Sequence, residues 1–262
     1  MRKNRLRERL DAGQPTLGTR LHATWSAVVE AIGHTAAFDY VEFLAEYAPF
    51  DLHDLDSFCR TAELHELATL IKVDAESRAY VAQRAIGAGF QAVLFADCRT
   101  AEDARDCVRC VRPDTPGDGG TYGAAMRRMA YMTYGGGPDY VQALREIVVV
   151  LMIEKQAAVE NLEEILSVDG IDMVQWGGVD YSMSIGRPGA KLTPEVKAVE
   201  RHVIETALRL GVPPRAEIGS VEQARYYLDL GVQHFSLGVD LSILYGWFAQ
   251  NGQDLRHLIG AA

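Results

Sequence analysis

The sequence of 262 residues is poor in cysteine and contains no long apolar run. Its four cysteines (Cys59, Cys98, Cys107 and Cys110) are too few for a disulfide framework in a chain of this length. No apolar run approaches the roughly 20 residues that a membrane-spanning helix needs. The basic stretch 1–15 lacks the apolar core of a secretory signal. We therefore expect a cytoplasmic protein.

An excess of positive charge is also missing. The chain has 26 Lys and Arg residues against 36 Asp and Glu, which gives a formal net charge of −10. Nucleic acids and anionic membranes would repel such a chain, so we expect neither as a partner. The content of 48% hydrophobic and 24% charged residues is ordinary for a globular protein.

One cysteine pair has the spacing of a metal or redox motif. Cys107 and Cys110 form a C-x-x-C pair within AEDARDCVRCVRP (101–113), a segment with the pattern of a helix. No second pair completes a zinc site, so packing on that helix is the preferred interpretation, with zinc or redox use as the minor alternative.

Short β-branched runs alternate with helical segments along the whole chain. Helical segments of this kind are 77–89, 155–168 and 221–231, and several close on glycine. The strand-like runs are 16–21, 39–44, 68–73, 91–96, 147–153, 172–176, 213–218 and 234–239. Eight strands alternating with helices predict a parallel sheet and, at this length, a closed (β/α)₈ TIM barrel as a single domain over 1–262. A doubly wound open sheet is the alternative, but no G-x-G-x-x-G follows an early strand.

Two segments depart from this alternation. Residues 114–140 form a Gly-rich insert, and loops of such length are often functional lids or interfaces. Arg127 and Arg128 within it could read a substrate carboxylate in a neighbouring subunit, although an exposed basic pair is the simpler explanation. A helical segment near 240–262 follows the last strand.

An acidic residue directly follows the most apolar of the predicted strands. Residues 148–153 are all apolar and are followed directly by Glu154, while the next strand ends in Gly177 and Gly178 before Asp180. A bare charge at the end of a buried strand is costly unless the site requires it. Taken singly, Glu154 could be an exposed acid at a helix start and Asp180 a helix cap.

Together, the two acids predict a metal site. The carboxyl ends of barrel strands form the active-site face, so acids ending adjacent strands can meet one hard cation. Mg²⁺ or Mn²⁺ accepts a pair of carboxylates and fills its other positions with water or substrate oxygens, and Co²⁺ or Zn²⁺ could replace it. A small 2-oxo acid such as pyruvate could chelate the cation through its carboxylate and keto oxygens.

The block from Glu154 to Gly189 resembles the HpcH/HpaI family of class II, metal-dependent pyruvate aldolases. The shared pattern is an apolar strand ending in Ile-Glu, a helix of the AVENLEEIL type, and then G-x-x-D-x-S-x-S-x-G-x-P-G. The stretches 37–51, 70–74, 88–105 and 218–244 are also similar to the family, so the likeness covers most of the chain.

The resemblance implies a (β/α)₈ barrel that assembles as a homo-oligomer, a hexamer or trimer with exchanged C-terminal helices. The metal would be held at Glu154 and Asp180. The implied reaction forms or cleaves a carbon–carbon bond to pyruvate through a metal-stabilised enolate, with a 4-hydroxy-2-oxo acid as the cleaved substrate. The substrate-binding residues would be Gly177, Gly178, Val179 and Trp176. Trp176 stands where the family often has a small aliphatic residue, so it could narrow the pyruvate end or belong to the barrel core.

Three positions depart from the family pattern. The family arginine is Lys72 here, the family histidine of a Glu-His-Gly-Pro motif is Tyr47 after Glu46, and the family glutamine before Ile-Glu is Met152. A lysine is a mobile point charge where arginine is a planar fork. Tyrosine is a poor base at neutral pH but can donate a proton. We expect Lys72, Tyr47 and Glu46 to be the catalytic residues, acting on an altered acceptor.

The sequence alone is also compatible with other reactions. Lys72 could form a Schiff base without metal, but this would leave Glu154 and Asp180 unexplained. A decarboxylase of 2-oxo acids, or a lyase or synthase of acyl-CoA or tricarboxylate substrates, would use the same enolate. A non-catalytic barrel that binds keto acids is a further alternative.

Overall fold

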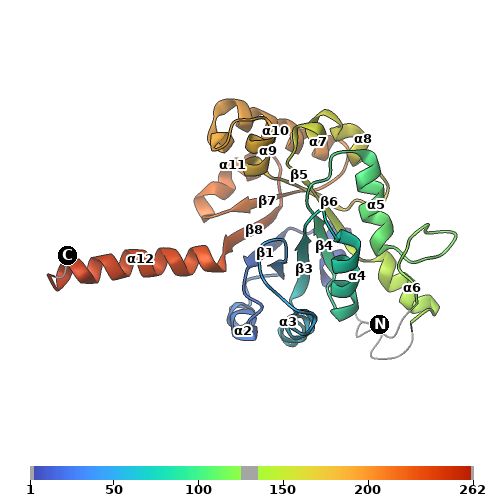
Figure 1. The fold of residues 1–262 in the computed structure, drawn as a ribbon, viewed down its shortest axis with the longest axis horizontal. Helices are drawn as coiled ribbons and strands as arrows, with labels where there is room; N and C mark the ends of the chain where they lie inside the picture. The colour runs from blue at the N-terminus through green and yellow to red at the C-terminus, as the bar shows by residue number, and fades with distance from the viewer. Residues whose placement is uncertain (1–2, 125–134, 261–262) are drawn as a thin grey trace.

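The computed structural model describes residues 3–124 and 135–260 and confirms the predicted TIM barrel. Eight parallel strands follow one another in chain order and close on themselves through pairing of the last strand with the first. Figure 1 shows the helices around this barrel. The strands are β1 Thr16–Leu21, β2 Tyr40–Leu44, β3 Ala68–Val73, β4 Ala92–Phe95, β5 Val148–Ile153, β6 Met173–Trp176, β7 Pro214–Ile218 and β8 His234–Val239.

The helices between these strands are short to medium in length. The α-helices are α1 Arg5–Asp11, α2 Ser26–His34, α3 Leu52–Leu64, α4 Arg78–Ala88, α5 Ala101–Val111, α6 Pro138–Arg145, α7 Gln156–Glu160, α8 Leu162–Leu166, α9 Gly178–Ser184, α10 Pro194–Arg209, α11 Ala224–Asp229 and α12 Asp240–Leu258. The described residues also contain two 3₁₀ helices, Ala190–Leu192 and Val221–Gln223.

The apolar runs of the sequence became strands because helices cover the barrel. Every residue of β3, β4 and β5 is buried. Their outward side chains pack against the helices, and their inward side chains fill the barrel. The pairing of β6 with β7 is the shortest in the described chain, with the pairs Val174–Pro214 and Gln175–Arg215 alone.

A buried ion pair crosses the barrel interior. Arg215 of β7 pairs with Glu42 of β2, and their side chains are 1% and 0% exposed. The Arg215 guanidinium also lies 5.4 Å from the ring centre of Tyr40. Arg215 Nε and Nη1 and Glu42 Oε1 find no hydrogen-bond partner among the described residues. Two buried charges therefore hold each other with part of their hydrogen-bonding capacity unused.

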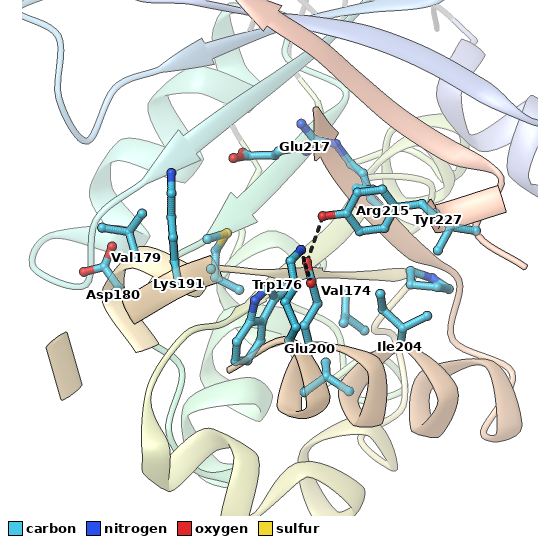
Figure 2. A pocket seen from close by; sticks show the side chains of 18 of the residues that line it. Val174, Trp176, Val179, Asp180, Lys191, Glu200, Ile204, Arg215, Glu217 and Tyr227 are labelled. Carbon is cyan, nitrogen blue, oxygen red and sulfur yellow. Dashed lines mark hydrogen bonds and ion pairs between the residues drawn. The ribbon is translucent and has the colours of Figure 1, made fainter. Parts of the chain in front are cut away.

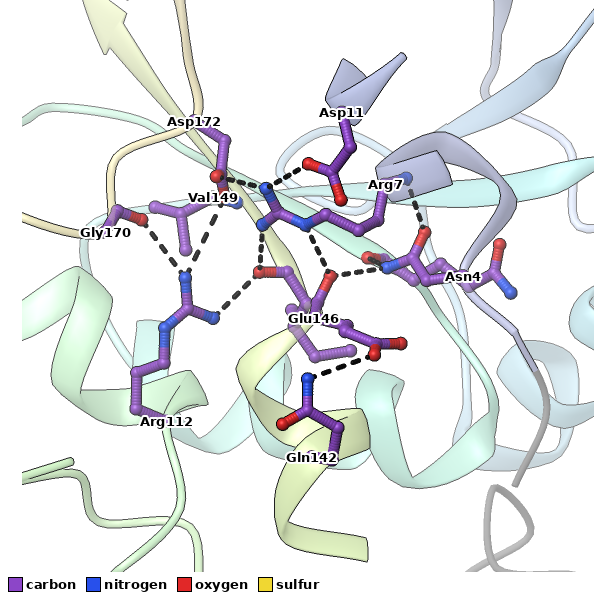
Figure 3. Close-up of polar contacts among 11 residues, drawn as sticks. Asn4, Arg7, Asp11, Arg112, Gln142, Glu146, Val149, Gly170 and Asp172 are labelled. Carbon is purple, nitrogen blue, oxygen red and sulfur yellow. Dashed lines mark hydrogen bonds and ion pairs between the residues drawn. The ribbon is translucent and has the colours of Figure 1, made fainter. Parts of the chain in front are cut away.

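The helix α1 closes the end of the barrel where the strands begin (Figure 3). Leu6 is 1% exposed and packs in a cluster with inward-facing residues of the strands. Asn4 Nδ2 donates to the carbonyls of Gln91 and Glu146 at 2.7 and 2.8 Å, and Arg7 lies 2.6 Å from Asp172. Because α1 covers the end of the barrel where the strands begin, the opposite end, where the strands finish, is available for a site.

The helix α12 points away from the barrel (Figure 1). Its first residue, Asp240, is fixed, because its carboxylate accepts hydrogen bonds from the backbone N–H groups of His22 and Ala23 at 2.9–3.1 Å. Beyond it, large apolar side chains are 48% to 81% exposed, namely Leu241, Ile243, Leu244, Tyr245, Trp247, Phe248, Leu255 and Leu258. The predicted C-terminal helix is therefore present, but its large apolar side chains do not pack into the core of this chain.

The structure differs from the sequence-based expectation in two segments. The helix expected over 155–168 is interrupted at Asn161, so that α7 and α8 are separate. The helix α6 starts at Pro138, inside the segment expected to be an irregular insert. Arg127 and Arg128 lie outside the described residues. In the part of the chain that is described, no helix has the length and apolarity needed to cross a membrane.

Candidate active site

The Glu154 carboxylate is held inside the protein at the end of β5. It is 2% exposed, so the explanation as a solvated acid at a helix start is wrong. Its Oε1 accepts a hydrogen bond from the backbone N–H of Asp97 at 2.8 Å, at the end of the neighbouring strand. Burial raises its pKa to about 7, and the nearby Asp180 carboxylate adds to this. The charges of Lys72 and Lys155 oppose this rise without cancelling it, so the buried carboxylate would gain from a further positive charge.

The second predicted acid stands at the mouth of the same site. Asp180 lies in the first turn of α9, and its side chain is 42% exposed. Lys155 Nζ lies 3.3 Å from Asp180 Oδ1 and 2.7 Å from Asp97 Oδ1. The oxygen Oδ2 of Asp180 accepts no hydrogen bond from the described residues. Asp180 thus keeps one carboxylate oxygen available to a ligand.

The two glycines before Asp180 have different tasks. A Cβ at Gly177 would lie 2.5 Å from Glu154 Cβ and 2.7 Å from Glu154 Oε2, so only glycine permits this close approach. The N–H of Gly177 is already bonded to the Ile153 carbonyl at 3.0 Å. The N–H groups of Gly178 and Val179 open α9 and have no acceptor within the helix. Of the two N–H groups expected to meet an anion, that of Gly177 is therefore occupied, while that of Gly178 has no acceptor within the helix.

The three predicted catalytic residues are in mutual contact. Lys72 Nζ lies 2.6 Å from Glu46 Oε2 and donates a hydrogen bond to the Tyr47 hydroxyl oxygen at 2.5 Å. Burial disfavours the Lys72 ammonium, but Tyr47 and Glu46 outweigh it and raise the pKa of Lys72. Burial of the hydroxyl end raises the pKa of Tyr47 to about 12, although 56% of the residue is exposed. Lys72 is therefore a cation at neutral pH and Tyr47 a neutral phenol.

Met152 faces an amide from the next strand. It pairs in register with Gln175 of β6, whose Nε2 donates to the Met152 sulfur at 3.1 Å and to Glu217 Oε1 at 2.6 Å. Glu217 in turn lies 2.6 Å from Arg20. A polar network of inward side chains thus lies beneath the site.

A cavity of about 580 Å³ opens among these residues (Figure 2). It is lined by Tyr47, Lys72, Met152, Trp176, Gly177, Gly178, Val179 and Asp180 together with residues of β7, α10 and α11. Glu46 and Glu154 stand directly behind lining residues, Lys72 and Gly177 respectively. The structure therefore brings the residues singled out from the sequence around one cavity.

The chemistry of these donors fits a hard divalent cation. Glu154 and Asp180 offer carboxylate oxygens, and the buried Glu154 carboxylate gains most from a positive charge beside it. In residues 3–124 and 135–260, no three His, Cys, Asp or Glu side chains converge as a metal site. The chain would thus supply two ligands and leave the other positions to substrate oxygens and water.

Sequence reasoning missed Asp97 and Lys155. Asp97 follows the apolar strand β4 after one further residue, Ala96, and a polar residue at that point is the available signal, as it was for Glu154. Its φ of 57° cannot be read from the sequence. The C-x-x-C cysteines lie buried on the predicted helix α5, and Cys107 is 3.5 Å from the sulfur of Cys98 rather than paired with Cys110.

Comparison with known proteins gives matches over most of the chain. A family model described as HpcH/HpaI aldolase/citrate lyase matches residues 26–245. The 4-hydroxy-2-oxo-heptane-1,7-dioate aldolase of Klebsiella pneumoniae is 29% identical over 92% of this chain and 89% of its own length. The enzyme of the same name from Escherichia coli is 28% identical over 92% and 91%.

A solved structure extends the likeness to three dimensions. The HpcH/HpaI aldolase/citrate lyase family protein from Burkholderia cenocepacia J2315 superimposes with a TM-score of 0.86 at 28% identity, covering 97% of this chain and all of that one. These matches confirm the resemblance drawn from the Glu154–Gly189 block and the prediction of an aldolase-type carbon–carbon lyase. The chain belongs to the HpcH/HpaI aldolase/citrate lyase family.

Proposed function

We propose that the protein is a metal-dependent aldolase that cleaves a 4-hydroxy-2-oxo acid to pyruvate and an aldehyde, or joins them, in the cytoplasm. The observation that carries the proposal is the geometry of one cavity, where the Asp180 carboxylate, with Glu154 behind Gly177, lies with a buried ammonium and a neutral phenol. An enolate needs positive charge at its oxygen, and the acceptor needs a proton donor. The alternatives of a Schiff-base enzyme, a decarboxylase, an acyl-CoA or tricarboxylate enzyme and a non-catalytic barrel account for fewer of these groups.

The cation would be held by Glu154 and Asp180, and we favour Mg²⁺ or Mn²⁺ because both donors are hard carboxylate oxygens. When bound, it supplies Lewis-acid polarisation of the pyruvate keto oxygen. The N–H groups of Gly178 and Val179 are positioned to hold the pyruvate carboxylate. Trp176 closes the cavity beside them.

Lys72 acts on the pyruvate part of the substrate, and Tyr47 acts on the aldehyde part. The Lys72 ammonium is fixed by Glu46 and supplies positive charge to the oxygen on which negative charge develops. Since Lys72 donates to the phenol oxygen, the O–H of Tyr47 acts as a donor, shared between the Glu46 carboxylate and a substrate oxygen that enters the cavity. In the synthetic direction, Tyr47 would give this proton to the aldehyde oxygen as the new bond forms.

The first test is proton exchange at the pyruvate methyl group in D₂O, followed by NMR. We expect magnesium to support loss of the methyl signal and EDTA to stop it. Glu154→Gln and Asp180→Asn should each lower the exchange rate by at least about 10²-fold, because each removes a ligand charge. Glu164→Gln, an exposed acid on α8, serves as the control and should exchange at the wild-type rate. Exchange that persists in EDTA would contradict the metal site.

A second copy of this chain is the proposed partner of α12. The helix carries a row of exposed apolar side chains, which a single chain leaves in water at a cost of about 25 cal/mol per Å². Its start is fixed at Asp240, so the exposed face has a defined direction. We propose that α12 packs on the barrel of a neighbour in a homo-oligomer, a hexamer or trimer.

Light scattering tests this assembly. We expect a mass that is a multiple of 28.8 kDa, and a fall to about one chain when Trp247→Asp and Phe248→Asp are combined. The pair Asn251→Asp and Gln253→Glu adds the same charge to the same helix without removing apolar surface. This control should keep the oligomer, and a wild-type monomer would contradict the proposal.

A further inference from the structure

Lys155 lies between two acids, one that follows β4 and one in the first turn of α9. Its Nζ is 2.7 Å from Asp97 Oδ1, and it donates a hydrogen bond to Asp180 Oδ1 at the longer distance of 3.3 Å. The side chains of Lys155 and Asp97 are mostly buried, while Asp180 is half-exposed at the edge of the cavity (Figure 2). Two carboxylates therefore share one ammonium, and Asp97 is the nearer of them.

Asp97 also holds the other acid of the proposed cation site. Its backbone N–H donates to Glu154 Oε1 at 2.8 Å. Its φ of 57° lies in the left-handed region, which Asp and Asn adopt more readily than most residues. The main chain of Asp97 thus fixes Glu154, while its carboxylate lies against Lys155.

A divalent cation and Lys155 compete for the same carboxylate. An ammonium bonded to Asp180 offsets part of the negative charge that this acid offers to a metal. With Asp180 as its only partner, Lys155 would form a close ion pair with it, and a cation would have to break that pair. Asp97 gives the ammonium a closer partner, so the contact with Asp180 stays long.

Lys155 remains a cation in this arrangement. Burial disfavours its ammonium, but the Asp97 carboxylate outweighs burial, and the charges of Asp180 and Glu154 add to this, so the pKa of Lys155 is raised. At neutral pH the site therefore always contains this positive charge, and its effect on a metal depends on which acid holds it.

We infer that Asp97 is a positioning residue of the cation site, which holds the Lys155 ammonium off Asp180 and so keeps that acid available to the metal. This inference rests on the proposed function, because the cation site is part of it. It explains how a lysine can directly follow one proposed metal ligand, Glu154, and contact the other without filling the site itself.

Titration of Mn²⁺ into the protein without substrate tests the inference, with the unbound ion followed by EPR. We expect Asp97→Asn to weaken Mn²⁺ binding by about 10- to 100-fold, the usual cost of losing a residue that orients metal ligands. Asparagine tolerates the left-handed backbone and keeps the N–H that holds Glu154, so the variant changes only the charge beside Lys155. Asp106→Asn, at an exposed acid paired with Arg109, is the control and should bind Mn²⁺ as the wild type does.

Removal of the lysine separates positioning from a simple effect of charge. Lys155→Met leaves Asp180 without its competing ammonium, so we expect Mn²⁺ to bind about threefold more tightly than in the wild type, or better. In that background, Asp97→Asn should weaken binding by less than about threefold, because there is no ammonium left to hold. An acid that acted only through its own negative charge would cost the same in both backgrounds.

Every outcome decides. An equal loss from Asp97→Asn with and without Lys155, or no loss at all, would overturn the inference while the metal site remained. Weaker binding in Lys155→Met would also overturn it, since the lysine would then support the site and not compete with the metal. Wild-type protein that binds no Mn²⁺ would instead remove the proposed metal site, and the inference with it. Thermal unfolding in EDTA shows which variants are folded, and where Asp97→Asn is not, the change in Lys155→Met alone decides.

Discussion

Replacement of Lys72 by methionine is expected to slow carbon–carbon cleavage by about 10²- to 10⁴-fold, with a smaller effect on KM. The ammonium is the one side-chain cation described that touches both Glu46 and Tyr47, and it lines the cavity. Methionine has a similar length but no charge, so the variant removes stabilisation of the developing enolate oxygen. Steady-state kinetics with a 4-hydroxy-2-oxo acid measures the loss as a drop in kcat.

Lys72→Arg is the matched control for charge. It keeps the cation but replaces a point charge by a planar fork, so we expect partial activity, between the wild-type and Lys72→Met values. Equal loss in both variants would show that shape, and not charge, limits the reaction. Wild-type turnover in Lys72→Met would remove Lys72 from the mechanism.

The same residue distinguishes metal from Schiff-base chemistry. A lysine that attacks a carbonyl must lose its proton, and it is usually prepared for this by a lowered pKa. Here the pKa of Lys72 is raised, because Tyr47 and the Glu46 carboxylate outweigh burial. We therefore expect borohydride to trap no pyruvate adduct on the protein, by intact mass. An adduct lost in Lys72→Met would reverse this assignment.

The strands could be predicted from the sequence because burial on both faces leaves a local signature. β5 appears as six apolar residues in succession, and the acid that follows it marks the strand end. The gathering of Glu154, Asp180, Lys72 and Tyr47 around one cavity follows from the rule that strand ends meet at one face. The interruption at Asn161 has no such signature, since the segment retains a helical pattern throughout.

Contacts between strands that are distant in the chain could not be predicted from the sequence. Glu42 stands within the apolar run 39–44 and carries the same signal as Glu154, a charge among apolar residues. Its partner, Arg215, is 173 positions away, and the two meet because the barrel closes.

Breaking the Glu42–Arg215 pair should have the largest effect on stability. With both side chains at most 1% exposed, Arg215→Met would leave the Glu42 carboxylate buried without its counter-charge. Burial already raises the pKa of Glu42, and Arg215 opposes this. We expect Arg215→Met to lower the free energy of unfolding by about 3–5 kcal/mol at neutral pH, measured by urea denaturation at fixed protein concentration.

The double variant Glu42→Leu with Arg215→Met should recover most of that loss. Arg215 Nε and Nη1 and Glu42 Oε1 have no partner in the described chain, so the native pair does not fully repay its desolvation. Arg105→Met, which removes an exposed arginine paired with Glu102, is the control and should change stability by less than about 1 kcal/mol. A double variant as unstable as Arg215→Met would mean that the pair itself, and not the orphaned charge, stabilises the barrel. In that case the two charges would fix the positions of β2 and β7 relative to each other across the interior, a task that apolar side chains of similar volume cannot perform.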